Sequence, residues 1–434
     1  MTNVFINAKA TAESIKPLHG TVNGPVANHD GTGGTVAEFK EMGIPYVRLH
    51  DSSFFVNYGG EHTVDISGIF PDFDRDADDE DAYDFFYTDS YIKRCLGTGA
   101  KIIYRLGQRI EPHPKKYHVH PPKDFKKWAQ ICEHIIRHYN EGWNEGFNYG
   151  IEYWEIWNEP DNAPACWTGT MEQFYDLFET SAKHLKSCFP NLKIGGPAFA
   201  EWSVDNGRVN HFLTEMKHRG VEIDFLSWHT YSRKLEDFQR RSVEVRRLLD
   251  TCGYPNAESI IDEWNYLINW KDGLQESRVR LMTMEGAAMA SALLCTAEDL
   301  PIDKMTYYDA RPCGFCGLFK AFTYEKYKTC HAFTLFNKVY NERSRIKAES
   351  DDGDVYVLAA KGEKCVGLVT YYTYAANMPE KTVSLHFDDS VKGTAELYVL
   401  DEARDAEKIG EAPADKPIEI SLKPNSVLYF EIKE

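Results

Sequence analysis

Two glutamates, Glu159 and Glu263, each lie at the end of a short run of apolar and aromatic residues of the kind that forms a buried strand. Because proline cannot continue a central strand, Pro160 should end the run 153–159 and leave Glu159 at the carboxyl edge. The run 259–265 repeats this pattern around Glu263. Two carboxyl groups that face one cavity can act as proton donor and nucleophile, and this pairing suggests glycoside hydrolysis.

Strand-like and helix-like segments alternate along the first three quarters of the chain, which is the pattern of a (β/α)8 barrel. Such barrels place their catalytic side chains at the carboxyl ends of the strands. The predicted strands cover residues 15–20, 44–49, 101–106, 153–159, 192–196, 223–228, 259–265 and 304–308. Capping boxes are predicted at Thr35 and Thr170, each with Glu or Gln three residues later, and 275–297 is predicted to form one long helix.

The remainder of the chain consists of short alternating strands separated by turn residues, which predicts a β-sandwich. The segment 412–417, which contains two prolines, is predicted as one of the turns. A short strand at 4–6 is expected to join this sandwich. The predicted fold class is therefore α/β, a (β/α)8 TIM barrel with a C-terminal β-sandwich. The predicted domains are 1–14 as an N-terminal strand of the sandwich, 15–340 as the catalytic barrel and 341–434 as the sandwich.

The chain is acidic, with a formal net charge of −18 over 434 residues and a pI near 5.3. Nucleic-acid binding requires a basic surface, so no such partner is expected. The sequence has no run of about 18 apolar residues, the length of a membrane span, and no secretion signal is recognised in its first residues. Ten cysteines in such a chain predict reduced thiols and a cytoplasmic location. Assembly into a homo-oligomer is left open.

The chain resembles the clan A glycoside hydrolases in its segments Trp157-Asn158-Glu159-Pro160 and Asp262-Glu263-Trp264-Asn265. Together with Trp228-His229-Thr230-Tyr231 and Arg48-Leu49-His50, these segments are similar to glycoside hydrolase family 39, which includes β-xylosidases and α-L-iduronidases. The resemblance covers nearly the whole chain, because that family also pairs a barrel with a β-sandwich. The fold it implies agrees with the alternation of strands and helices.

The resemblance implies that Glu159 is the acid/base, that Glu263 is the nucleophile and that Asn158 binds the 2-hydroxyl of the sugar. An acid must be protonated before the attack, so Glu159 is expected to have a raised pKa, whereas Glu263 should be ionised. Tyr231 would donate a hydrogen bond to Glu263 and keep it charged.

Further residues near the predicted strand ends complete the expected substrate site. They are His50, His229, Tyr231, Trp264, Asp309 and Arg311. His50 and His229 would bind sugar hydroxyls, with a structural histidine as the alternative for each. The end of the eighth strand lacks the tryptophan expected from the resemblance, so Arg311, with Asp309, would shape the sugar subsite. Arg311 would either hold a uronate carboxylate or neutralise acidic neighbours.

Two segments carry side chains of the kind that bind metal ions, but neither has the spacing of a known site. Cys313, Cys316 and Cys330 match no common zinc ribbon. The acidic run 72–81 begins like a calcium loop but has Ala77 where the sharp turn needs glycine. We therefore expect neither a metal ion nor a cofactor.

The predicted activity is that of a retaining, exo-acting glycoside hydrolase that releases a terminal sugar from short oligosaccharides or glycosides, most like a β-xylosidase. The alternatives are an α-L-arabinosidase, β-galactosidase or uronidase, or an inactive carbohydrate-binding barrel. A metal-dependent barrel hydrolase is disfavoured, because the first predicted strand carries His19 alone. Exo-action needs a cavity closed at one end. Its wall is expected from the aromatic residues Phe54, Phe55, Tyr58, Phe70, Phe73, Tyr83, Phe85 and Phe86.

Overall fold

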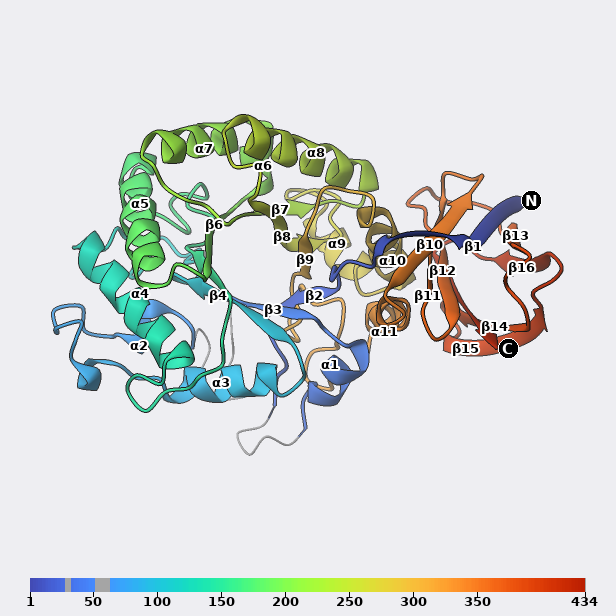
Figure 1. Cartoon of the computed structure of the whole chain (residues 1–434), viewed down its shortest axis with the longest axis horizontal. Helices are drawn as coiled ribbons and strands as arrows, with labels where there is room; N and C mark the ends of the chain where they lie inside the picture. Colours follow the sequence, from blue (N-terminus) through green and yellow to red (C-terminus); the bar gives the residue numbers. More distant parts are fainter. Residues whose placement is uncertain (28–32, 51–62, 434) are drawn as a thin grey trace.

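A closed barrel of eight parallel strands forms the larger part of the molecule (Figure 1). The computed structural model describes residues 1–27, 33–50 and 63–433, apart from the side chains of residues 11 and 12. The barrel strands follow one another in sequence order. They are β2 (Gly20–Val22), β3 (Tyr46–Leu49), β4 (Lys101–Leu106), β5 (Tyr153–Ile156), β6 (Lys193–Phe199), β7 (Phe225–Tyr231), β8 (Glu258–Asn265) and β9 (Lys304–Tyr307). The predicted TIM barrel is confirmed.

Helices on the connections surround the barrel (Figure 1). They are α1 (Val36–Met42), α2 (Ile66–Ile69), α3 (Phe86–Leu96), α4 (Phe125–Asn140), α5 (Met171–Cys188), α6 (Glu201–Asp205), α7 (Arg208–His218), α8 (Leu235–Thr251), α9 (Leu274–Arg280), α10 (Met284–Ala297) and α11 (Lys328–Asn341), with a 3-10 turn at Glu80–Ala82. In α4, buried residues such as Trp128, Ile135 and Tyr139 recur at helical spacing, so one face of the helix packs on the barrel.

Several barrel strands are shorter than the sequence predicts, and the largest differences are at β2 and β5. The segment 15–20 contributes only its last residue to β2, because Lys16 donates its backbone N–H to the carboxylate of Glu298 at 3.1 Å instead of to a neighbouring strand. Strand β5 ends at Ile156, three residues before the predicted end, because the backbone of Trp157 turns to a φ of 74°. This early turn changes the direction of the chain before Glu159.

The two predicted capping boxes have different outcomes. Thr170 and Gln173 form the predicted reciprocal box at the start of α5. Thr35 precedes α1 but makes no side-chain cap, because its hydroxyl accepts the N–H of Val26 at 3.2 Å. The predicted long helix at 275–297 is also wrong: it is divided into α9 and α10, and the Thr283 side chain caps the second.

The C-terminal strands and the N-terminal strand β1 (Thr2–Ser14) make one nine-stranded sheet in the order β15-β14-β17-β12-β11-β10-β1-β13-β16. Its other strands are β10 (Ser344–Ser350), β11 (Val355–Lys361), β12 (Cys365–Tyr371), β13 (Lys381–Phe387), β14 (Thr394–Leu400), β15 (Asp405–Pro413), β16 (Ile418–Leu422) and β17 (Ser426–Lys433). The predicted turn at 412–417 begins inside β15, where Pro413 still pairs with Thr394.

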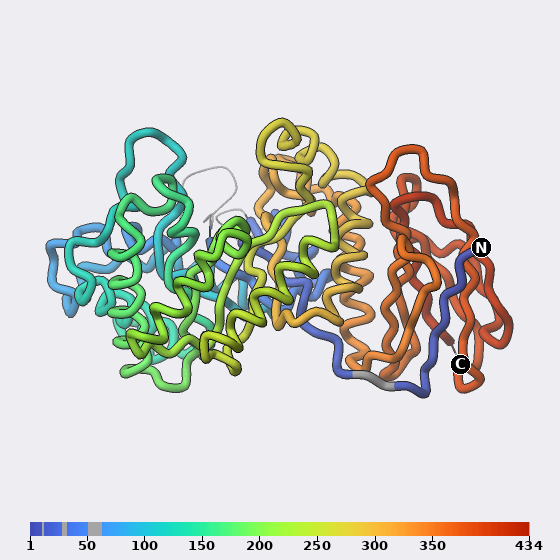
Figure 2. Tube along the Cα trace, turned by 90° about the horizontal axis from the view of Figure 1, so that it is seen from above, coloured from blue at the N-terminus to red at the C-terminus, as the bar shows by residue number. Residues whose placement is uncertain are grey.

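The sheet packs on itself as a sandwich. Phe387 of β13 and Phe430 of β17 lie five positions apart in the strand order, yet their ring centroids are 5.2 Å apart. Strand β1 lies between β10 and β13, so the two ends of the chain meet in this sheet (Figure 2). We propose the division into residues 1–14, 15–340 and 341–434 on this basis.

The sandwich packs against α10 and α11 of the barrel (Figure 1). Buried residues of both parts, such as Leu293 of α10 and Leu368 of β12, belong to one hydrophobic cluster. The hydroxyls of Ser291 and Thr370 are 2.7 Å apart in this interface. In the ranges that the structure describes, no helix combines the length and apolar character needed to cross a lipid bilayer.

Candidate active site

A cavity of about 460 Å³ lies at the carboxyl ends of the barrel strands. Five of its polar lining residues lie in or directly after four different strands, as in barrel enzymes. His50 follows β3, Asn158 and Glu159 follow β5, Tyr231 ends β7, and Glu263 lies in β8. The structure therefore brings together five of the residues predicted for the substrate site.

The backbone turn after β5 directs Asn158 and Glu159 into the cavity. Trp157 and Glu159 have φ values of 74° and 46°. Such left-handed conformations cost on the order of 1–3 kcal/mol in residues other than glycine. The neighbouring strands hold the turn, because Trp157 donates its N–H to Leu106 of β4 and Glu159 donates its N–H to Ala198 of β6.

A β-bulge in β8 places two successive carboxylates inside the barrel. Trp228 of β7 pairs with Ile261, but the next residue of β7 pairs with Glu263, so Asp262 is the extra residue. Asp262 and Glu263 therefore both reach the guanidinium of Arg48, at 2.9 Å each.

His229 lies between the two glutamates. Its Nδ1 is 2.8 Å from Oε1 of Glu159 and 3.4 Å from Oε2 of Glu263. One ligand atom from each of the three residues falls within 4.8 Å of the others. On the outer side, Asn162 donates to Oε2 of Glu159 at 2.9 Å, and the hydroxyl of Tyr231 donates to Oε2 of Glu263 at 2.5 Å.

Arg48, which the sequence indicates only through the family resemblance, contacts side chains from two other strands of the site, β5 and β8. Its fully buried guanidinium contacts Glu155 at 2.7 Å and donates to Oε1 of Glu263 at 2.9 Å. It also donates to Oδ1 of Asn158 at 2.7 Å. A signal for this network was present, because Arg48 and Glu155 are single charged residues inside apolar strands, and a buried charge requires partners.

The charges of the three central residues depend on one another. Burial alone would lower the pKa of His229, but the carboxylates of Glu263 and Asp262 outweigh burial and raise it well above its usual range. Burial would raise the pKa of Glu159, but the hydrogen bond and the charge of His229 outweigh burial and lower it. Burial raises the pKa of Glu263 to about 7, against the opposing charges of His229 and Arg48.

The predicted order of the two glutamate pKa values is therefore reversed in the free protein. Glu159 was expected to be protonated and Glu263 ionised. The reason for the difference is the position of His229, whose Nδ1 lies closer to Glu159 than to Glu263 and stabilises the ionised form of Glu159 more strongly.

Four residues predicted to bind substrate do not line the cavity. One is His229, which is buried between the two glutamates. Trp264 is fully buried and packs edge-on against Tyr307, with ring centroids 5.0 Å apart, because side chains alternate along β8 and Glu263 takes the inner side. Asp309 is buried and accepts a hydrogen bond from Asn23 at 2.8 Å. Arg311 lies beside Asp309, with its Nε 3.5 Å from the carboxylate.

The arginine that does line the cavity is Arg278 of α9. Its Nε is buried, and within the described part of the chain it has no hydrogen-bond partner. The sequence did not indicate this residue, because the predicted single helix at 275–297 gave no reason to turn it toward the strand ends.

Aromatic side chains from the later connections form the apolar wall of the cavity. They are Trp202, Trp270, Tyr308 and Phe315. The rings of Trp270 and Phe315 are stacked, with centroids 6.2 Å apart and an interplanar angle of 10°. Glu201 of α6 holds this wall in place, because it accepts hydrogen bonds from the Trp270 indole at 2.8 Å and from the Tyr231 backbone at 2.7 Å. Flat aromatic faces of this kind suit the apolar faces of sugar rings.

The predicted wall from the segment between β3 and β4 is not found in the described residues. Phe70 and Phe85 are buried in the barrel's hydrophobic cluster, and Phe86 is exposed. Phe73 and Tyr83 pack partly buried against the same cluster. The remaining predicted residues, Phe54, Phe55 and Tyr58, lie outside the described residues.

Neither of the two segments considered for metal binding brings three possible ligands together in the described residues. Cys313 lies 3.7 Å from the carboxylate of Asp309, and the Cys316 thiol accepts the N–H of Phe319 at 3.4 Å. Neither these thiols with Cys330 nor the acidic run 72–81 forms a group of three metal ligands in the described residues. Glu159, His229 and Glu263 do form such a group, but the charged imidazole between the carboxylates accounts for their closeness.

Comparisons with known proteins show which family the chain resembles. The model of the family described as Glycosyl hydrolases family 39 matches residues 37–247. A beta-xylosidase of Geobacillus stearothermophilus is 24% identical over 357 residues, which cover 73% of this chain and 67% of that protein.

Among solved structures, a glucosidase from Croceicoccus marinus superimposes with a TM-score of 0.84 at 21% identity, over 100% of this chain and 99% of the other. A monomeric beta-xylosidase from Caulobacter crescentus CB15 superimposes with a TM-score of 0.74 at 16% identity, over 99% of each chain. These structural matches include both the barrel and the sandwich. The chain is a glycoside hydrolase that resembles glycoside hydrolase family 39.

Proposed function

We propose that this glycoside hydrolase removes a terminal sugar from short oligosaccharides or glycosides with retention of configuration, and that β-D-xylosides are its substrates. The observation that carries the proposal is the position of Glu159 and Glu263, which meet across one imidazole with ligand atoms within 4.8 Å. Retaining glycosidases hold their two carboxyl groups about 5–5.5 Å apart, whereas inverting enzymes need about 6.5–9.5 Å to admit a water molecule.

The reaction has two steps. In the first, the carboxylate of Glu263 attacks the anomeric carbon, the bond to the leaving group breaks, and Glu159 gives its proton to the leaving oxygen. In the second, Glu159 takes a proton from water while the water oxygen attacks the same carbon and releases Glu263. Each step inverts the carbon, so the product retains its configuration.

The proton that Glu159 needs is held by His229. In the free protein His229 is charged and Glu159 is ionised, and the two are joined by a 2.8 Å hydrogen bond. Transfer of the proton along this bond leaves both groups neutral. Glu263 is then stabilised as a carboxylate by Arg48 at 2.9 Å and Tyr231 at 2.5 Å.

Asn158 is held in one orientation by Arg48. Because its Oδ1 accepts from the guanidinium at 2.7 Å, its NH₂ group remains to donate to a sugar hydroxyl. This arrangement supports the expected role at the 2-hydroxyl, where a hydrogen bond should strengthen as the sugar ring flattens in the transition state.

A panel of 4-nitrophenyl glycosides tests the substrate. We expect β-D-xyloside to have the highest kcat/KM, ahead of α-L-arabinoside, β-D-galactoside, β-D-glucoside and α-L-iduronide. Proton NMR of the first product should show the β-anomer. Release of the α-anomer would contradict retention, and hydrolysis of none of the glycosides would favour an inactive carbohydrate-binding barrel. Early release of xylobiose from xylohexaose would contradict exo-action. The cytoplasmic location stays a prediction, to be checked by cell fractionation.

A further inference from the structure

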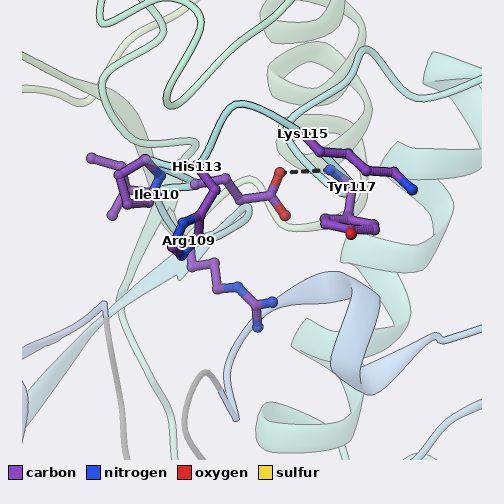
Figure 3. Close-up of a pocket in the computed structure, with 7 residues that line it drawn as sticks. Arg109, Ile110, His113, Lys115 and Tyr117 are labelled. Atoms are coloured by element: carbon purple, nitrogen blue, oxygen red, sulfur yellow. Dashed lines mark hydrogen bonds between the residues drawn. The ribbon is translucent and has the colours of Figure 1, made fainter.

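A second pocket lies beside the cavity and has a different character. Its volume is about 400 Å³, and it is formed by the loop that follows β4 (Figure 3). Arg109, His113 and Lys115 line it, and Ile110 lines both this pocket and the cavity that holds Glu159. We call the pocket lined by residues 109–117 the cationic pocket.

The three basic side chains of the cationic pocket form no ion pair with any carboxylate in the residues that the structure describes, although the chain carries a net charge of −18. Lys115 lies over the ring of Tyr117, 5.1 Å from its centroid. Among the described residues that line the pocket, the one acidic side chain is Glu111. Its carboxylate accepts the backbone N–H of Tyr117 at 2.7 Å, the hydrogen bond drawn in Figure 3. The carboxylate of Glu111 is therefore already hydrogen-bonded within its own loop.

The loop is fixed to the segment that carries Glu159. Glu111 donates its N–H to the carbonyl of Ala165 at 2.8 Å, and Thr168 donates its N–H to the carbonyl of Val119 at 2.9 Å. In a double displacement the acid gives its proton to the leaving oxygen, so the leaving group must lie on the side of Glu159. The cationic pocket therefore adjoins the place where the leaving group would lie.

We propose that the cationic pocket binds a carboxylate carried by the leaving group of the glycoside. This inference rests on the proposed function, because it needs Glu159 as the acid. Arg109 is the principal contact: a guanidinium can hold a carboxylate through two parallel hydrogen bonds. Lys115 adds positive charge to the pocket, and the imidazole of His113 adds a further polar group. The leaving group is then either a uronic acid residue or an aromatic acid, which share this chemistry.

Paired substrates test the inference. The first pair is the β-D-xyloside of 4-hydroxybenzoate and that of 4-hydroxybenzamide, and the second is xylose linked to glucuronate and xylose linked to glucose. Wild-type protein is compared with Arg109→Gln and with Arg247→Gln, which removes the same charge from an exposed position of α8. For each pair, the ratio of kcat/KM for the acid to kcat/KM for the neutral partner is compared between variants, which cancels intrinsic reactivity.

We expect Arg109→Gln to lower this ratio about tenfold in at least one pair, as the loss of a charge-assisted hydrogen bond would. Arg247→Gln should leave the ratio unchanged, and 0.5 M NaCl should reduce the wild-type ratio. A fall confined to the aryl pair identifies an aromatic acid, and a fall confined to the disaccharides identifies a uronate. Equal ratios in wild type and Arg109→Gln for both pairs would overturn the inference.

A binding measurement separates this inference from the proposed function. Calorimetric titration with 4-hydroxybenzoate and 4-hydroxybenzamide needs no turnover. Wild type should bind the acid more tightly than the amide, and Arg109→Gln should lose the difference. If the protein hydrolysed glycosides but showed no such difference, the cationic pocket would not be a carboxylate site. If it hydrolysed none, the proposed function would fail, and this leaving-group assignment would fail with it whatever the titration gave.

Discussion

Strand β8 carries a glutamate near each of its ends, and the two have opposite properties. Glu258, at the amino end, contacts the ammonium groups of Lys193 and Lys304 and accepts from the Tyr153 hydroxyl at 3.0 Å. Burial would raise its pKa, but the two lysines outweigh burial and lower it. Glu263, near the carboxyl end, has a pKa raised to about 7. One strand therefore carries a carboxylate paired with lysines and the carboxylate that we propose as the nucleophile.

The difference lies in the balance of charge around each glutamate. At the amino end, the Glu258 carboxylate meets two lysines, one of which also lies 3.7 Å from the more exposed carboxylate of Glu152. At the carboxyl end, the carboxylates Glu155, Glu159, Asp262 and Glu263 share two cations, Arg48 and His229. An excess of buried carboxylates holds protons in the site near neutral pH: burial also raises the pKa of Glu155 to about 8. Proton transfer at pH 7 requires groups of this kind.

The largest effect on activity is expected when the side chain of Glu263 is removed. Glu263→Ala should lower kcat on an aryl xyloside by at least about 10⁴-fold, as loss of a nucleophile does in other enzymes. Azide should restore part of the turnover and give a product of inverted configuration. Glu258→Gln, at the other end of the same strand, should keep kcat within about twofold and lower stability by about 1–3 kcal/mol. Equal loss of activity in both variants would contradict the comparison.

Replacing Arg48, the cation shared by the carboxylates at the carboxyl end, should lower stability and activity more than replacing a lysine at the amino end of β8. Arg48→Met leaves the carboxylates around it without their main partner, and breaking a buried ion pair costs about 3–5 kcal/mol. We expect urea unfolding to show a loss of this size, with activity reduced at least about 100-fold where the protein remains folded. Lys304→Met should cost less, because Glu258 retains Lys193. The comparison would be wrong if Lys304→Met were the more damaging change.

The pH dependence should follow Glu263. In the proposed mechanism the ionised form of Glu263 attacks the sugar, so kcat/KM should fall as the pH drops through about 7. The Tyr231 hydrogen bond lowers the pKa of Glu263, so Tyr231→Phe should raise that pKa and move the acidic limb about one unit toward higher pH. Tyr153→Phe removes the corresponding hydroxyl from Glu258 and should leave the limb in place. Equal shifts of the acidic limb in both variants would contradict the assignment of that limb to Glu263.

The smallest effect is expected at the two arginines near the outer rim. Arg278→Gln should lower kcat/KM about tenfold, because Arg278 lines the cavity with a buried Nε, and one charged hydrogen bond is worth about 1.5–3 kcal/mol. Arg311→Gln should change kcat/KM less than about threefold on neutral glycosides, because Arg311 lies beside Asp309 outside the cavity. A larger loss of kcat/KM in Arg311→Gln would support the prediction from the sequence that Arg311 shapes the sugar subsite.

Several features of the fold and the cavity follow from local sequence patterns. Alternating apolar runs and helix signals predict the barrel, because a strand or helix must bury its apolar face in one of few layered arrangements. The strands at Lys101–Leu106 and Lys304–Tyr307 match their predicted ranges to within a residue. The cavity contains His50, Asn158, Glu159, Tyr231 and Glu263, all of which were expected there.

Other features depend on backbone geometry that single residues do not reveal. The prediction missed that a bulge at Asp262 would turn two successive carboxylates inward, and it placed Trp264 in the cavity rather than behind it. It missed the division of 275–297 into two helices, which brings Arg278 to the cavity. It also assigned the aromatic wall to the wrong connection. Aromatic residues are common both in hydrophobic cores and in sugar-binding surfaces, so their presence in a segment does not show which of the two they form.

The sequence by itself determined the order of elements and the chemical groups available at the strand ends, because periodicity and residue type are local properties. Only the tertiary structure decided which groups are charged. The pKa of Glu159 is lowered and that of Glu263 raised because His229, from a third strand, lies 2.8 Å from one and 3.4 Å from the other. Electrostatic energy in a buried site depends on such distances, and they exist only after the strands have closed into a barrel.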